Sequence, residues 1–184
     1  MNTWEALQGR LVKQLINAAA ILERLPHVDA VQVLSSAENY GVLGDKLSTM
    51  QRDLTAAQVE SIELLFRAMA STLVDFHRVV LALEKIWRDG CQLLKAEKPQ
   101  PTPQQLQQRV GPRPSLHDCL EGLRSLYQMH YDEYNLKVAV VSSLTYDSRE
   151  EDVSLLLTLV SDQPNIPSEE VKYIFDLISA GNGK

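Results

Sequence analysis

The residues best suited to covalent chemistry in this sequence are its two cysteines and two of its four histidines. Cys91 or Cys119 could act as a nucleophile with His117 or His130 as its base, provided that folding brings one of each within hydrogen-bond reach. The alternative is that both cysteines are buried free thiols, since neither belongs to a C-x-x-C pair. We favour the free thiols, with Cys119 on the core side of a helix and His117 in its solvent-facing first turn.

Metal and phosphate chemistry lack the motifs that usually supply them. The chain has no H-E-x-x-H, Glu-x-x-His or His-x-x-x-His for a helix-borne metal, and neither G-x-x-x-x-G-K-[ST] nor G-x-G-x-x-G for a phosphate. The adjacent carboxylates Asp132 and Glu133 point about 100° apart on a helix, so we predict a solvated face there. We therefore expect no catalytic residues, no metal, no cofactor and no small-molecule substrate.

Composition points to one domain of ordinary size. The 184 residues are 45% hydrophobic, which is enough for one core. The formal net charge of −6 disfavours non-specific electrostatic binding of nucleic acid. Apolar runs such as 18–22 and 155–157 fall far short of the roughly 20 residues that span a bilayer. The first ten residues show no basic-then-apolar leader, so we expect an intracellular protein with no membrane contact.

The clearest structural signal is a helical stripe of apolar residues after Thr55. Thr55 with Gln58 matches a capping box, and prolines follow Lys95, which predicts one helix over 56–95. Its apolar positions recur in three- and four-residue steps, with a gap at Gly90. They are Val59, Ile62, Phe66, Met69, Leu73, Phe76, Val80, Leu83, Trp87 and Leu94.

Two further stripes predict two more long helices. The first contains Trp4, Leu7, Leu11, Leu15, Ala18, Leu22 and Leu25. The other contains Leu116, Leu120, Leu123, Tyr127, His130, Tyr134, Val141 and Leu144. Ser115 with Asp118 resembles a capping box at the start of the latter. Together they predict an all-α fold: an elongated bundle of three long helices with coiled-coil-like seams and a C-terminal helical hairpin.

The shorter elements complete a single domain over 1–184. We assign 1–96 to the N-terminal long helices, 97–114 to a Pro/Gln-rich loop, 115–146 to the third long helix and 147–184 to the hairpin. A small helix is expected to use Leu43, Leu47, Met50 and Leu54. Thr102 and Pro103 can start a short helix in the loop. Ser148 with Glu151 predicts a helix through Val160, and Val171, Ile174, Phe175 and Ile178 mark a last one before Gly181. Residues 26–40 remain unassigned.

A few polar and aromatic residues could be core or interface. His130 and Tyr134 interrupt an apolar stripe, and we favour a polar layer inside the bundle over a partner surface. Trp4 and Trp87 lie on stripes, which favours a core position over an interface hot spot.

A proline-bounded turn between the last two helices is the candidate partner-binding site. Its residues are Asp162, Gln163, Pro164, Asn165, Ile166 and Pro167. Rigid exposed loops offer preorganised contact surfaces, although the same turn could simply connect two helices. On the binding interpretation, Asn165 and Ile166 are surface residues whose replacement leaves melting nearly intact.

Three stretches resemble a known family. They are Asn39, Tyr40, Gly41, Val42, Leu43 and Gly44; the pattern Ser115, Asp118, Leu120, Glu121, Leu123, Tyr134 and Lys137; and the turn at 162–167 followed by Glu169, Glu170 and Val171. They look like a group of small eukaryotic helical proteins, many of them uncharacterised in plants and algae. The third helix is similar to the animal ribosome maturation factor that partners an AAA ATPase of the Afg-two type and, through its C-terminal region, to a related cyclin-dependent-kinase-interacting protein. The likeness covers most of the chain for the plant-type group and about the C-terminal half for the animal proteins.

The resemblance implies a non-catalytic adaptor in large-subunit ribosome maturation, in the nucleus, the cytoplasm or both. Its implied partners are an AAA ATPase and a second small helical subunit, with direct nucleic-acid contact not expected. Two alternatives stay open: a coiled-coil subunit of another assembly, such as a tethering or cytoskeletal complex, and a small Cys/His enzyme. Partner identity, stoichiometry and which small subunit this chain represents are left undecided by the sequence.

Overall fold

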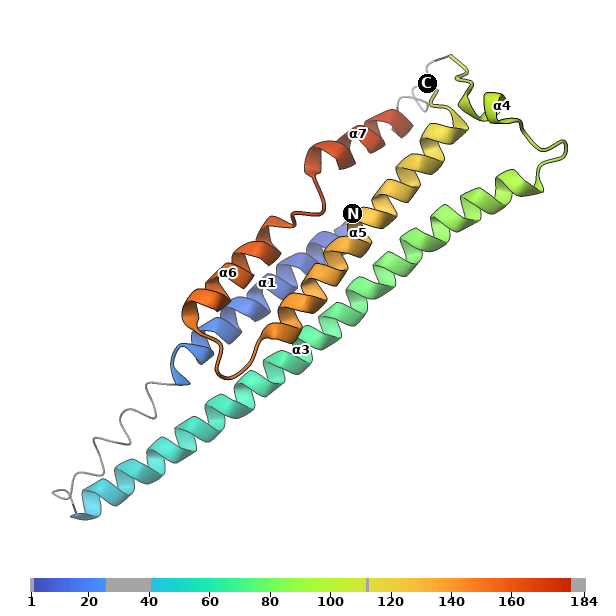
Figure 1. The fold of residues 1–184 in the computed structure, drawn as a ribbon. Coiled ribbons are helices and arrows are strands. Elements are labelled where there is room, and N and C mark those ends of the chain that lie inside the picture. Colours follow the sequence, from blue (N-terminus) through green and yellow to red (C-terminus); the bar gives the residue numbers. More distant parts are fainter. Residues whose placement is uncertain (1, 26–40, 112, 180–184) are drawn as a thin grey trace. The chain divides into compact units, whose positions relative to one another are not determined.

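The fold is built from helices. A computed structural model describes residues 2–25, 41–111 and 113–179, which form six helices and no strand (Figure 1). The helices are α1 (Asn2–Leu22), α3 (Gly41–Ala96), α4 (Pro103–Gln107), α5 (Leu116–Ser143), α6 (Glu150–Asp162) and α7 (Ser168–Ser179). The all-α prediction, with three long helices and two short ones at the C-terminus, is confirmed. The unassigned stretch 26–40, which includes Asn39 and Tyr40 of the resemblance, lies outside the described residues.

Helix α3 is longer than the sequence predicts. It begins at Gly41 and has 56 residues, about 84 Å at about 1.5 Å per residue. The start at Thr55 is therefore wrong, and the small helix expected around Met50 is the beginning of α3. Thr55 donates its hydroxyl to the carbonyl of Gln51 at 3.0 Å, as an interior threonine does, and the Gln58 side-chain oxygen accepts no hydrogen bond. A capping sequence acts as a cap only where the upstream helix is missing.

The described residues group into two compact units that share α3 and α5. Unit 1 comprises Met1–Val74 and Val138–Asp162, and unit 2 comprises Asp75–Lys137 and Gln163–Lys184. In unit 1 the α1 stripe is confirmed, since every position from Trp4 to Leu22 on it is buried. It shares the core with Ile62, Met69, Leu73, Val140, Leu144, Val153 and Val160. Helix α6 lies along α1, where Gln8 donates to the Val160 carbonyl at 2.7 Å.

Unit 2 packs α3, α5 and α7 around a second core. Its central cluster consists of Leu126, Met129, Val171 and Ile174, with Ile166 and Ile178 against it. Two glycines permit close helix packing. A Cβ at Gly90 would lie 3.0 Å from Leu120, and one at Gly122 would lie 3.1 Å from Ile174. The gap that Gly90 leaves in the α3 stripe is thus a point of close approach between α3 and α5.

The buried face of α5 differs from the predicted stripe. The buried positions are Gly122, Leu126, Met129, Glu133, Lys137, Val140 and Leu144. Leu116 is exposed, and the other predicted positions except Leu144 are only half-buried. The polar layer at His130 and Tyr134 is wrong in detail, because these residues flank the core while Glu133 and Lys137 occupy it. Tyr134 stacks on His77 with ring centroids 5.2 Å apart. Trp87 is half-buried and stacks on Tyr127.

Two of the predicted loop features are confirmed and one is wrong. Thr102 caps α4 with a complete capping box to Gln105, and α4 ends at Gln107. Ser115 and Asp118 form the predicted reciprocal cap of α5, at 3.1 and 3.2 Å. Ser148 does not cap α6: its hydroxyl accepts from the Thr145 backbone at 2.9 Å, which closes a turn before α6 begins.

The α5 cap gives a first testable prediction. The hydrogen bonds from Ser115, assisted by Arg109, hold the pKa of Asp118 below its usual range. Because the folded-state pKa is lower than the unfolded one, this stabilisation is present above the usual aspartate pKa and is lost as pH falls through the folded value. We expect Ser115→Ala to raise the Asp118 pKa, measured by NMR titration of its side chain. The exposed Ser154→Ala is the control, and an unchanged Asp118 pKa in Ser115→Ala would contradict the cap.

Candidate functional site

The candidate nucleophiles have environments that suit inert thiols. Cys91 and Cys119 are both free and half-buried, and burial, with a smaller effect of Asp118, raises the pKa of the Cys119 thiol. A raised pKa lowers the thiolate fraction that a nucleophile needs. The Nδ1 atom of His130 lies 2.7 Å from the Leu126 carbonyl oxygen of its own helix. Among the described residues, no three His, Cys, Asp or Glu side chains gather where they could hold a metal ion.

None of the described helices combines the length and the apolar character that crossing a bilayer requires.

The predicted partner-binding turn is partly anchored. Asp162, Pro164 and Pro167 are exposed, whereas Gln163, Asn165 and Ile166 are half-buried. Gln163 has φ 46°, and its carbonyl accepts from the Ile166 backbone at 2.9 Å. Ile166 packs on the unit 2 core. The premise that Asn165 and Ile166 are free surface side chains is therefore wrong, while a binding role for the exposed residues stays a prediction.

Asn165 completes a buried polar cluster. Its backbone and side-chain amides both donate to Oε2 of Glu133 at 3.2 Å, and Lys137 donates to Oε1 of the same carboxylate at 2.5 Å. Glu133 and Lys137 are 0% exposed, so the solvated face predicted for Glu133 is wrong. The Lys137 ammonium also lies 5.6 Å from the Phe76 ring centroid. Burial excludes a substrate from this cluster, which instead holds the turn before α7 against α5.

Because of these hydrogen bonds, we expect the turn to contribute to the free energy of unfolding. We expect Asn165→Ala to lower the free energy of unfolding by about 1–3 kcal/mol, because it removes a donor to a buried carboxylate. Urea unfolding followed by circular dichroism measures the change. Pro164→Ala is the matched control, since its exposed ring makes no such bond. Equal stability of the two variants would show that the Asn165 amide contributes nothing.

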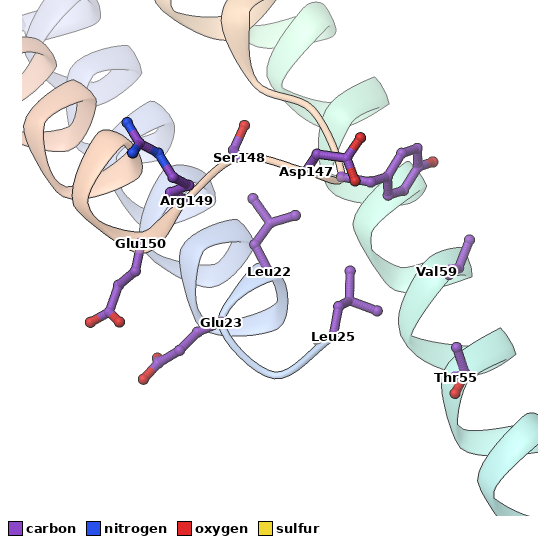
Figure 2. Close-up of a pocket in the computed structure, with 10 residues that line it drawn as sticks. Leu22, Glu23, Leu25, Thr55, Val59, Asp147, Ser148, Arg149 and Glu150 are labelled. Carbon is purple, nitrogen blue, oxygen red and sulfur yellow. The ribbon is translucent and has the colours of Figure 1, made fainter. Parts of the chain in front are cut away.

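A cleft lies in unit 1, at the loop between α5 and α6. We call it the loop cleft. Its volume is ≈ 780 Å³, and it is lined by Leu22, Glu23, Leu25, Thr55, Val59, Tyr146, Asp147, Ser148, Arg149 and Glu150. Figure 2 shows Leu22 and Leu25 at the end of α1. Thr55 and Val59 lie across from them on α3, and the α5–α6 loop with Asp147 and Ser148 lies above. The cleft therefore depends on three chain segments that meet only in the folded unit.

Two smaller clefts adjoin the loop cleft. One, of ≈ 280 Å³, runs between α1 and α6 past Ile16, Ala20 and Leu157, and shares Leu22, Glu23, Ser148 and Glu150 with it. The other, of ≈ 470 Å³, lies along Leu155 and Leu156 of α6 and shares Asp147 and Ser148. Ser148 lines all three. The three clefts thus adjoin one another at Ser148 of the α5–α6 loop.

Tyr146 is fixed in place by residues of α3. Its hydroxyl donates to Glu63 at 3.3 Å, and its ring meets the edge of Phe66 at 5.9 Å between centroids. Burial and the Glu63 carboxylate raise the pKa of Tyr146, so the phenol stays neutral at physiological pH. The cleft wall at this point is aromatic and uncharged.

Sequence reasoning missed the loop cleft. The segment 146–152 was interpreted only as a helix cap, although it joins an aromatic residue to a run of acidic residues. That combination is the one sequence signal for the loop cleft, because the pattern places Leu22, Leu25 and Val59 on core stripes.

Comparison with known proteins gives one finding. No curated protein matches the chain. A protein-family model described as CA109-like, Ribosome biogenesis protein C1orf109-like, matches residues 1–182. That span takes in every described helix, together with both compact cores and the loop cleft. The chain therefore belongs to the C1orf109-like family of ribosome biogenesis proteins.

Proposed function

We propose that the protein is a non-enzymatic adaptor that acts in large-subunit ribosome maturation by binding other proteins. The observation that carries the proposal is the family match, which covers nearly the whole chain. Ribosome biogenesis favours this function over a tethering or cytoskeletal subunit. The proposed partners are an AAA ATPase and a second small helical subunit, and the proposed location is the nucleus, the cytoplasm or both.

The surface chemistry supports contacts with proteins rather than chemistry on small molecules. Large apolar side chains such as Leu93, Leu155 and Tyr173 are mostly exposed, although each helix also contributes to a core. Exposed apolar side chains rimmed by polar ones are typical of protein interaction sites. Part of the turn at 162–167 remains a proposed contact through Asp162, Pro164 and Pro167. The organisation of both units as one domain belongs to the same proposal.

Affinity purification of the tagged full chain from cells, followed by mass spectrometry, tests this function. We expect an AAA ATPase and precursor large-subunit particles to be recovered, and the reciprocal purification of the ATPase to return this chain. Pro164→Ser with Pro167→Ser tests the turn, because neither ring is needed for a core. The adaptor function would be rejected if this chain recovers no AAA ATPase and the purified ATPase does not recover this chain. Equal recovery by the double variant would reject only the turn as the contact.

A further inference from the structure

The loop cleft and its two neighbours form an apolar floor that the described residues of unit 1 leave open. Leu22 and Val153 belong to the core and reach this floor, whereas Ile16, Tyr146 and Leu155 are 47, 45 and 70% exposed. Contiguous exposed apolar surface on a folded chain is typical of an interaction site. A volume of ≈ 780 Å³ lies within the usual size of ligand sites and can hold more than one large side chain.

The charges around this floor are mainly negative. Glu23, Asp147 and Glu150 are exposed, and none of them forms an ion pair with another described residue. In Figure 2 the carboxylates of Glu23 and Glu150 point to the same side, away from Val59. Among the described lining residues Arg149 is the only basic one, and it donates two hydrogen bonds to Asp152, at 2.8 and 3.1 Å. The cleft rim therefore presents net negative charge.

We propose that the loop cleft binds a basic amphipathic segment of a partner protein, with its leucine-type side chains on the apolar floor and its lysines or arginines at Glu23, Asp147 and Glu150. The charge complementarity selects this occupant, because an acidic rim repels nucleic acid and acidic peptides alike. The inference rests on the proposed adaptor function and gives one class of partner for it.

A synthetic peptide tests the inference directly. The probe is a fluorescent 16-residue helix with leucines at i, i+4 and i+8 and lysines on the flanking positions, titrated with the full chain and followed by anisotropy. We expect saturable binding that weakens as salt rises. The double variant Glu23→Lys/Glu150→Lys should weaken binding at least about tenfold and should now bind the matched peptide with glutamates in place of lysines.

Matched controls separate specific docking from general attraction. Glu60→Lys reverses an exposed charge of unit 1 outside the clefts and should leave peptide binding unchanged. A peptide with serines in place of leucines should bind at least about tenfold more weakly, since it cannot bury apolar surface. Equal binding of the leucine and serine peptides would overturn the inference. A loss of peptide affinity in Glu60→Lys as large as in Glu23→Lys/Glu150→Lys would also overturn it. So would a wild-type dimer that the double variant dissociates, because a second copy would then occupy the cleft.

Failure of this inference can be told apart from failure of the adaptor function. Recovery of the ATPase by wild type without any peptide binding would overturn the cleft assignment and leave the adaptor function standing. Peptide binding without recovery of the ATPase by this chain, or of this chain by the ATPase, would support the cleft assignment and reject the proposed adaptor function.

Discussion

Lys137→Met is expected to lower the free energy of unfolding by about 3–5 kcal/mol, the usual cost of breaking a buried ion pair. Lys137 and Glu133 are both 0% exposed, so methionine would leave the Glu133 carboxylate buried with only the Asn165 amides as partners. Removing the ammonium also ends its contact with the Phe76 ring. Urea unfolding monitored by circular dichroism measures the loss as a lower midpoint.

Two further variants identify the cause of that loss. Lys85→Met breaks an exposed pair with Asp89 at the same i,i+4 spacing, where solvent already screens both charges, and should hardly move the midpoint. Glu133→Gln/Lys137→Met removes both charges while keeping an oxygen for Asn165, and should be more stable than Lys137→Met alone. A double variant less stable than Lys137→Met would show that packing, rather than an unpaired buried charge, determines the effect.

Two of the three long helices could be predicted in detail because their buried faces are mainly apolar, with Gln8 and Thr72 as buried polar exceptions. Every α1 position from Trp4 to Leu22 on the predicted stripe is buried, and no α3 position from Val59 to Leu94 on its stripe is exposed. In such helices the hydrophobic period and the core face coincide. The extension of α3 back to Gly41 was missed because a capping pattern cannot reveal whether the helix upstream of it continues.

The core face of α5 was misplaced for a different reason. A buried ion pair occupies its middle, and treating the charged residues Glu133 and Lys137 as solvent-exposed shifts the predicted stripe toward Tyr127 and His130 at the edge of the core. Burial of Glu133 depends on Lys137 on the same helix and on Asn165, which lies 32 residues further along the chain. The i,i+4 spacing of the pair was visible in the sequence, but its burial was not, because most such pairs are solvent-exposed.

The two candidate sites also differ in whether they depend on local sequence or on tertiary contacts. The proline turn is local, so its position and exposed prolines could be predicted, whereas its anchoring to Glu133 is tertiary. The loop cleft needs α1, α3 and the segment 146–150 together, and no local pattern encodes their meeting. The acidic residues of its rim can be seen in the sequence, but only the fold shows which carboxylates surround apolar surface.

Phe76 joins the long stripe of α3 to the buried polar cluster. It is 0% exposed, and its ring lies against the ammonium of Lys137, which itself is committed to Glu133. Its surroundings therefore combine an apolar site with a charge that is already balanced. Neither the apolar site nor the Lys137 ammonium can accommodate a second carboxylate.

We accordingly expect Phe76→Asp to abolish the cooperative thermal unfolding of unit 2. Loss of the ring alone costs about 3–5 kcal/mol, and the new buried carboxylate competes with Glu133 for one ammonium, against a total stability of about 5–15 kcal/mol for a typical domain. Circular dichroism and hydrogen exchange of α5 and α7 measure the outcome. Leu81→Asp, at a 47% exposed position on the same helix, is the control and should melt almost like wild type. If Phe76→Asp and Leu81→Asp melt alike, the face of α3 that carries Phe76 is not a core.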